Sequence, residues 1–336
     1  MASVSFEKGS FSDHLHEVIG RKAGLAASIS HMCDLLAGTG FNDMIINSEK
    51  HGLRIRPEDY ESLYYELLYK VGATEERHNG MFDVFKVGQE IEKIGGINFS
   101  IDIHQIYAQG MSLEIDLAAK EGRKTINPEK MFIEADNKHG KKGVECLGKL
   151  LLASETARKV SPFSAVDFQQ WGDTLNISDL FEQYHPTVTS GEFLDQRFIN
   201  YLSVNGEQLG NIHWRKFEEL IAECFSKFGY NVDLGPGSND DGVDIRVWNE
   251  LDAAPKFIIQ CKRTKSKIDK VTVKGLYADV VHEKGEIGLL VTSSEFSIGA
   301  RKTVEARGYP IEEVNGDNIR KWLTELRTPG SGIVRI

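Results

Sequence analysis

The hydrophobic pattern is most regular in the last third of the chain. Apolar residues between Phe217 and Phe228 recur at i, i+3, i+4, i+7, i+8 and i+11, which is the spacing of one face of an amphipathic helix. Gly229 follows directly, where a glycine commonly ends a helix. Three short apolar runs come next and are predicted as strands, at residues 230–234, 243–247 and 257–259.

The pattern after these strands alternates helices with apolar strands. Helical spacing covers residues 273–281 and 297–306, and apolar positions in 319–326 mark a last helix. The run Ile287–Thr292 is apolar on both faces, as expected for a buried central strand, and 310–314 is predicted as a short strand. The order helix, three strands, helix, strand, helix, strand, helix predicts an α/β domain with a mixed sheet flanked by helices.

The N-terminal part predicts a separate α+β domain over residues 1–190, followed by a linker at 191–213 and the α/β domain at 214–329. The linker prediction depends on a proline and glycines in this region. Helices are expected near Ser12–Leu36, Pro57–Val71 and Gly143–Val160.

A hairpin is expected between the second and third of these helices. Apolar and polar residues alternate over residues 97–107 and again over 111–117, and the break at 108–110 suggests a three-residue turn. This register places one pair of like charges and one favourable pair across the strands, namely Asp102 opposite Asp116 and His104 opposite Glu114. A ligand, cation or basic partner would relieve the repulsion, so these four residues are a candidate ligand site. A solvated face or a different register is the alternative.

Composition limits the class of protein. The chain has 336 residues, enough for two domains of ordinary size. It has no run approaching the roughly 20 apolar residues that span a bilayer, and its start lacks the basic and apolar segments of a signal peptide. Its four cysteines are scattered, which argues against a zinc ribbon or a disulfide framework. We therefore expect a cytoplasmic protein with no membrane segment.

The net charge of −10 argues against a generic nucleic-acid coat, but the charge is unevenly spread. Residues 1–204 hold 21 Lys and Arg against 30 Asp and Glu, whereas residues 205–336 hold 19 against 20. A basic run lies just after the third predicted strand and is the expected place for phosphate contacts with DNA: Arg263, Lys265, Lys267 and Lys270. A solvated loop is the alternative for such a run.

The residues with the clearest chemistry end that third strand. Gln260 and Lys262 are two apart, so they point to the same face of a strand. If the strand that contains Asp244 pairs with it, a carboxylate, an amide oxygen and an ammonium converge. Asp244, Gln260 and the carbonyl of Cys261 then suit Mg²⁺, which prefers oxygen ligands. Lys262 is expected to orient or deprotonate an attacking water, and Glu218 on the first helix to approach the same site.

Four segments together resemble the catalytic domain of Mrr-type restriction endonucleases, in the PD-(D/E)xK nuclease superfamily. They are Trp214–Leu220, Asp241–Ile245, Gln260–Arg263 and Leu290–Ser293, in the family's order and over roughly a third of the chain. The resemblance implies that Asp244 binds the metal, that Lys262 is catalytic and that Glu218 is the acid of the first helix. Gln260 stands where the wider superfamily has Glu or Asp, which implies weaker metal binding that depends more on bound DNA.

The sequence thus predicts an enzyme, a DNA endonuclease that hydrolyses phosphodiester bonds with Mg²⁺, for which Mn²⁺ substitutes. The resemblance implies a role in prokaryotic antiviral defence against foreign or modified DNA. Because cutting both strands needs two active sites, a homodimer or higher homo-oligomer is expected. One alternative is an effector nuclease gated by a small molecule, or a protein activator, that binds the N-terminal domain. The other is a DNA-binding protein without catalysis.

Overall fold

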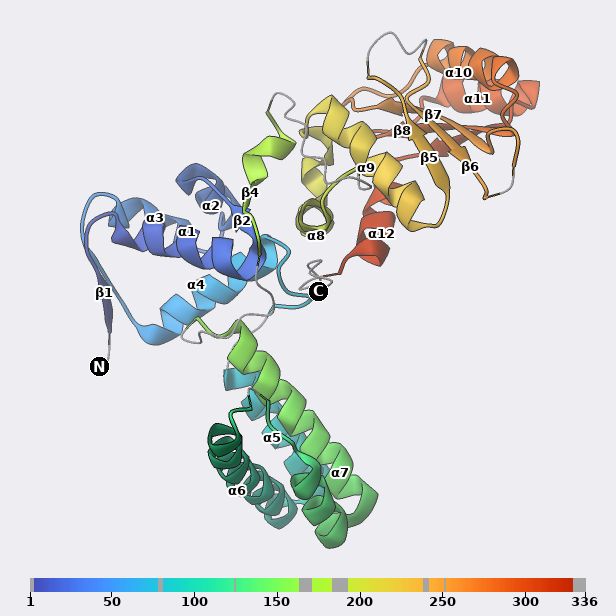
Figure 1. The fold of residues 1–336 in the computed structure, drawn as a ribbon. Helices are drawn as coiled ribbons and strands as arrows, with labels where there is room; N and C mark the ends of the chain where they lie inside the picture. The colour runs from blue at the N-terminus through green and yellow to red at the C-terminus, as the bar shows by residue number, and fades with distance from the viewer. Residues whose placement is uncertain are drawn as a thin grey trace. The chain divides into compact units, whose positions relative to one another are not determined.

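The computed structural model describes residues 3–77, 81–123, 125–162, 171–182, 193–237, 242–250 and 252–328. Two compact units make up the chain, and each is assembled from separate segments (Figure 1). The helical unit comprises Met1–Ser5, Arg54–Glu66 and Glu76–Phe168, and the sheet unit comprises Phe6–Leu53, Leu67–Glu75 and Gln169–Ile336. The domain boundaries expected from the sequence stay predictions.

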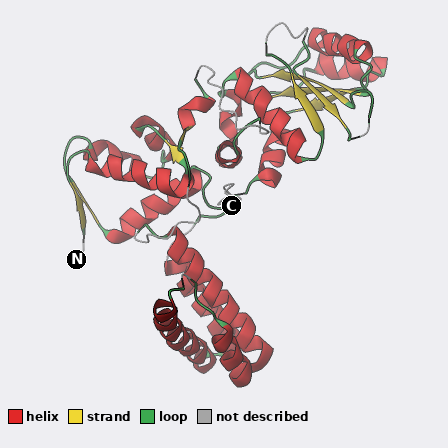
Figure 2. Ribbon diagram, in the orientation of Figure 1, coloured by secondary structure: helices red, strands yellow, loops and turns green. Residues whose placement is uncertain are grey.

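A five-stranded mixed sheet forms the core of the sheet unit, drawn in yellow in Figure 2. Its strands, in spatial order, are β5 (Asn231–Leu234), β6 (Ile245–Trp248), β7 (Phe257–Lys262), β8 (Ile287–Thr292) and β9 (Ile311–Val314). β6 is antiparallel to both of its neighbours, β5 and β7, whereas β7, β8 and β9 run parallel to one another. The predicted mixed sheet is therefore confirmed, with the parallel pairs connected by helical crossovers.

Helices cover this sheet in the predicted order. They are α9 (Trp214–Lys227), α10 (Lys270–His282), α11 (Ile298–Arg307) and α12 (Gly316–Leu326). α10 and α11 lie side by side (Figure 1) and share a core with the central strands. In that core Leu276 of α10 packs with Ile258 and Leu290, all fully buried. The expected buried character of the Ile287–Thr292 strand follows from this packing.

Several strand limits differ from the sequence prediction, and two of them lie at the candidate site residues. β6 begins at Ile245 rather than Val243, so Asp244 directly precedes the strand. The ladder ends there because the N–H of Cys261 donates to the side chain of Asp244 instead of to a backbone carbonyl. β7 is longer than its apolar run and includes Lys262, because it continues to pair with β8 as far as Thr292.

Short elements complete the sheet unit. They are α1 (Ser10–Ala23), β2 (Leu25–Ala26), α2 (Ile29–Leu35), α3 (Phe41–Ser48), β4 (Leu175–Asn176), η1 (Ile177–Leu180), α8 (Gln196–Val204) and η2 (Gly206–Gly210). β2 pairs in parallel with β4, and β1 (Val4–Phe6) pairs with β3 (Leu53–Ile55). Within the segment expected to be a linker, α8 and η2 are helical, and α8 packs against α12. Packed structure therefore occupies the described part of that segment.

The helix expected over Ser12–Leu36 is interrupted at Gly24. This residue has φ +63°, in the left-handed region, and ends α1. A Cβ at this position would lie 2.4 Å from the ring of Trp171 and 2.9 Å from Nη1 of Arg197. The break is therefore required both by backbone conformation and by a close approach that only glycine permits.

Three long helices form most of the helical unit: α5 (Met81–Gly95), α6 (Ile97–Glu121) and α7 (Glu129–Val160). Their shared core includes Ile91, Ile103 and Leu147, which are fully buried. α7 is kinked at Gly140, and the helix expected from Gly143 is the part after the kink. α4 (Pro57–Lys70) matches the helix expected over Pro57–Val71.

The hairpin expected over residues 97–117 is wrong, because α6 is one continuous helix there. The buried positions Phe99, Ile103 and Ile106 follow helical spacing and face the bundle core. The alternating pattern arose because the helix also carries exposed isoleucines, among them Ile97 and Ile101. The apolar residues on the outer face of the helix, together with those on its buried face, therefore gave the two-residue hydrophobic period that is typical of a strand.

None of the helices in the described part of the chain combines the length and the apolar character needed to cross a bilayer.

Replacing Gly24 by alanine is expected to lower the free energy of unfolding by about 2 kcal/mol or more, because left-handed strain adds to a clash with Trp171. Gly38→Ala is the matched control, since Gly38 has φ +78° but nothing within 4 Å of a Cβ. That control is expected to cost about 1 kcal/mol. Urea denaturation measures both, and equal losses would contradict the steric role of Trp171.

Candidate functional site

Asp244 is held at the start of β6 by two bonds to β7. Its Oδ2 accepts a hydrogen bond from the N–H of Cys261 at 2.6 Å, and its own N–H donates to the carbonyl of Ile259 at 3.0 Å. The side chain is buried, with 8% of the residue exposed. A short hydrogen bond to a carboxylate is among the stronger ones in proteins, so this one fixes the carboxylate against β7.

Gln260, in the middle of β7, presents a buried acceptor without a partner. Its Nε2 donates to the carbonyl of Gly242 at 2.8 Å, which sets the orientation of the amide. Its Oε1 is buried and accepts no hydrogen bond from the described residues. A buried oxygen left in this state costs about 1–3 kcal/mol, so the site favours a water or a cation beside it.

The carbonyl of Cys261 is the third oxygen of this group. β6 pairs with β7 only at Phe257–Ile259, so Cys261 lies beyond the paired part of the ladder. The N–H and C=O of one strand residue point to the same side, and the N–H of Cys261 points to Asp244. The carbonyl is therefore directed to the Asp244 side of β7.

These donors fit a hard divalent cation, because all three are oxygens and one carries a charge. Among the described residues, no three side chains of His, Cys, Asp and Glu gather as a metal cluster. A cation at this place would therefore depend on one carboxylate and on neutral oxygens.

The charges expected at the site act on one buried group, the thiol of Cys261. Burial raises the pKa of this thiol well above its ordinary value, and the negative charges of Asp244 and Glu218 raise it further. The positive charge of Lys262 acts in the opposite direction. The charges of Glu218 on α9, Asp244 before β6 and Lys262 on β7 thus all reach this thiol. The expectation that Gln260 and Lys262 share a face agrees with their two-residue spacing in β7.

Glu218 lies on the buried face of α9 and is paired with a residue that sequence reasoning missed. Its Oε2 accepts a hydrogen bond from Nη1 of Arg215 at 2.9 Å. One residue further along the helix, Nζ of Lys216 donates to Oε2 of Glu219 at 2.8 Å, and both side chains are buried. The signal for both pairs was present in the sequence, as opposite charges three residues apart on a helix.

α9 begins with a histidine cap close to the basic run. Nδ1 of His213 accepts a hydrogen bond from the N–H of Arg215 at 3.2 Å. Burial lowers the pKa of His213, and the positive charge of Arg263 lowers it further. The neutral imidazole is therefore favoured, which keeps the acceptor that caps the helix.

The basic run lies after β7 and reaches the start of α10. Nη1 of Arg263 donates to the carbonyl of Gly210 at 3.2 Å. Lys267 is paired with Glu295, with 2.7 Å between Nζ and Oε1. Lys265 and Lys270 are exposed. The run is thus accessible, but its positive charge is partly neutralised at Lys267.

The candidate ligand site in the N-terminal part is not assembled. Asp102, His104, Glu114 and Asp116 all lie on α6, and 14 residues of helix separate the two aspartates by about 21 Å. Nδ1 of His104 bonds to the carbonyl of Ser100, one turn away, at 2.7 Å. The facing pairs that motivated the prediction do not exist, because a helix separates residues that a hairpin would place opposite each other.

Comparison with known proteins confirms the resemblance found in the sequence. Residues 209–323 match the restriction endonuclease family model of Mrr-type catalytic domains. Uncharacterized protein y4cE of Sinorhizobium fredii (strain NBRC 101917 / NGR234) is 29% identical over 110 residues, which are 32% of this chain and 28% of that protein. The chain therefore spans about a quarter of the length of the curated relative that it matches. This segment thus matches a restriction-endonuclease domain, a class of DNA-cleaving hydrolases that generally uses divalent metals.

Among solved structures, the MspJI restriction endonuclease in complex with a 27-mer oligonucleotide is 20% identical and covers 43% of this chain and 35% of its own. The TM-score is 0.26, so this similarity says nothing further about the chain.

The stability of this domain is expected to decrease as the pH falls below about 6.5, the ordinary pKa of histidine. The pKa of His213 is lower in the folded chain than in the unfolded chain, so the unfolded chain binds a proton at this residue first as the pH falls. The neutral His213 therefore contributes its full stabilisation only above pH 6.5. His213→Asn keeps a capping acceptor that does not titrate, so it is expected to flatten this dependence. Thermal unfolding from pH 5 to 8 measures it, with the exposed His282→Asn as control. An unchanged profile in the His213 variant would contradict the cap assignment.

Proposed function

We propose that this protein is a Mg²⁺-dependent DNA endonuclease that hydrolyses phosphodiester bonds, with Mn²⁺ as a substitute. The observation that carries the proposal is the buried, unpartnered Oε1 of Gln260, which is adjacent in the chain to Cys261, the residue whose N–H fixes the carboxylate of Asp244. An oxygen group of this kind suits a divalent ion better than it suits a purely structural core. The family match of residues 209–323 supports phosphodiester cleavage as the chemistry.

Asp244, Gln260 and the carbonyl of Cys261 would hold the metal. The bound ion would supply positive charge to a phosphate oxygen and lower the pKa of a water. Lys262, as the catalytic lysine, would orient that water and stabilise the charge that develops on the phosphate. Glu218 would act as a positioning residue, since its charge reaches the Cys261 thiol while its carboxylate is paired with Arg215.

DNA would reach the site along the basic run that follows β7. Arg263, Lys265, Lys267 and Lys270 would contact phosphates, which gives affinity without sequence specificity. Cutting both strands needs two active sites, and we propose that a homodimer or larger homo-oligomer supplies them. We place this activity in the cytoplasm of a prokaryote, in defence against foreign or modified DNA.

Asp244→Asn and Lys262→Ala are each expected to reduce Mg²⁺-dependent plasmid cleavage by about 10²–10⁴-fold, because each removes a charge used in the transition state. EDTA is expected to abolish cleavage, and added Mg²⁺ or Mn²⁺ to restore it. Lys274→Ala, an exposed lysine of α10, is the matched control and should cleave normally. Full cleavage by both site variants would refute the assignment. A wild type that binds DNA but never cleaves with any metal would support a binding protein instead.

Removal of a phosphate contact is expected to weaken DNA binding equally for all DNA sequences. It should also reduce the slope of log K against the logarithm of the salt concentration by about 0.9. Lys265→Ala and Lys270→Ala should each show this effect. Lys267→Ala should show less, because Glu295 already pairs with Lys267. Fluorescence anisotropy at several salt concentrations measures the slopes. An equal loss in the Lys267 variant would mean that its ion pair does not persist when DNA binds.

A further inference from the structure

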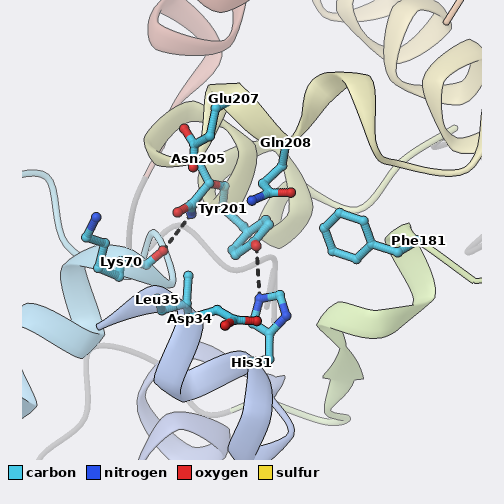
Figure 3. A pocket seen from close by; sticks show the side chains of 9 residues that line it. All are labelled: His31, Asp34, Leu35, Lys70, Phe181, Tyr201, Asn205, Glu207 and Gln208. Atoms are coloured by element: carbon cyan, nitrogen blue, oxygen red, sulfur yellow. Dashed lines mark hydrogen bonds between the residues drawn. The ribbon is translucent and has the colours of Figure 1, made fainter. Parts of the chain in front are cut away.

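A separate cavity lies in the sheet unit (Figure 3), and its lining includes none of the residues assigned to cleavage. Its volume is about 220 Å³. α2, the end of α4, the residue after η1, α8 and η2 all contribute to its wall. The residues that line it are His31, Asp34, Leu35, Lys70, Phe181, Tyr201, Asn205, Glu207 and Gln208.

Three aromatic rings form one part of the wall. The His31 ring centroid is 6.0 Å from that of Phe181 and 5.8 Å from that of Tyr201. Nε2 of His31 and the hydroxyl of Tyr201 are hydrogen bonded at 2.9 Å, as drawn in Figure 3. Phe181 and Tyr201 come from segments far apart in the chain from His31, so folding builds this aromatic surface. Tyr201 is only 1% exposed and holds His31 through this bond, so the half-buried rings of His31 and Phe181 are the ones that offer stacking to a flat ring.

The polar groups around these rings are mainly acceptors. In the part of the chain that the structure describes, no hydrogen bond or ion pair engages the carboxylates of Asp34 and Glu207 or the ammonium of Lys70. The amide hydrogens of Asn205 donate to the carbonyls of Lys70 and Tyr201, at 2.8 and 2.9 Å. Its Oδ1 is thus a further acceptor. The lone pairs of these acceptors outnumber the hydrogens of the donors, which are Lys70, the amide nitrogen of Gln208 and the ring N–H of His31.

We propose that this cavity binds a small heteroaromatic amine, that is, an amino-substituted nucleobase or its nucleoside. The aromatic rings would stack on the base, and Asp34, Glu207 and the Asn205 oxygen would accept hydrogen bonds from its amino and ring N–H groups. A volume of about 220 Å³ lies below the roughly 300–1,000 Å³ of pockets for drug-sized ligands, which favours a ligand as small as a base or nucleoside. Two carboxylates against one ammonium disfavour a phosphate in the same space, so the free nucleoside is preferred to the nucleotide.

A short path connects this cavity with the proposed cleavage site. Glu207 and Gln208 belong to η2, whose last residue, Gly210, accepts the hydrogen bond from Arg263. Arg263 is adjacent to Lys262 in the chain. A ligand that orders η2 therefore biases the segment that carries the catalytic lysine, and the regulatory part of the inference rests on the proposed nuclease function.

Isothermal titration calorimetry on the full chain tests the binding. The probes are adenosine, cytidine and guanosine, compared with inosine and uridine, which lack the exocyclic amine. At least one amino nucleoside is expected to bind about tenfold or more tighter than its amino-free counterpart, because a hydrogen bond to a carboxylate is worth that much. The monophosphate of the same nucleoside should bind more weakly. No binding by any nucleoside, or equal binding of the amino-free ones, would overturn the proposal.

Variants connect that binding to the cavity. Asp34→Asn and Phe181→Leu should each weaken the binding by about tenfold, since they remove a charged acceptor and a stacking ring. Asp43→Asn, an exposed aspartate of α3 outside the cavity, is the matched control and should bind as the wild type does. Spermidine tests the need for an aromatic ring. Spermidine that binds as tightly as the best nucleoside, or variants that bind like the control, would place the ligand elsewhere.

Plasmid cleavage with and without the best nucleoside tests the coupling. A rate change of at least about threefold is expected in the wild type and in Asp43→Asn, and none in Asp34→Asn at the same ligand concentration. Calorimetric binding without any change in rate would remove the regulatory part and keep the site. If the wild type cleaves no DNA at all, the nuclease proposal fails, whereas the calorimetry still decides the binding site.

Discussion

The bond between the Asp244 carboxylate and the N–H of Cys261 connects two functions of the structure. It marks where β6 stops pairing with β7, and it holds a charged group against Cys261, near the end of the central strand of the mixed sheet. A backbone carbonyl at the same position would continue the ladder and would leave the carboxylate elsewhere. The site therefore exists because a side chain replaces a main-chain acceptor at one point in the sheet.

Burial of the polar groups at this site lowers the free energy of unfolding, but it also fixes groups that a metal or substrate can use. The Oε1 of Gln260 has no partner among the described residues, and the Cys261 thiol is kept neutral by burial beside two negative charges. α9 adds the Arg215–Glu218 and Lys216–Glu219 pairs, which satisfy charges that would otherwise be expensive in a buried helix face. Polar groups that are fixed and only partly satisfied are common at functional sites.

The two units illustrate different limits of sequence reasoning. In the sheet unit, apolar runs too short for helices alternate with regular helical spacing, and the order of elements follows from that pattern alone. In α6 the same reasoning failed, because the helix is apolar on its buried face at Phe99 and Ile103 and on its exposed face at Ile97 and Ile101. Apolar residues on two faces of one helix can alternate with polar residues along the sequence as they do in a strand. The packing of α6 against α5 and α7 shows which of its two apolar faces is buried.

The sequence by itself determined the order of helices and strands from α9 to α12 and the shared face of Gln260 and Lys262, because both depend on local periodicity. It also gave the family resemblance, which depends on the order and spacing of four segments. Tertiary structure decided the partner of Asp244, and it decided that the charged pairs on α9, which the sequence already placed three residues apart, are buried. It alone assembled the cavity around Tyr201, because these contacts join residues distant in the chain whose separation no local pattern encodes.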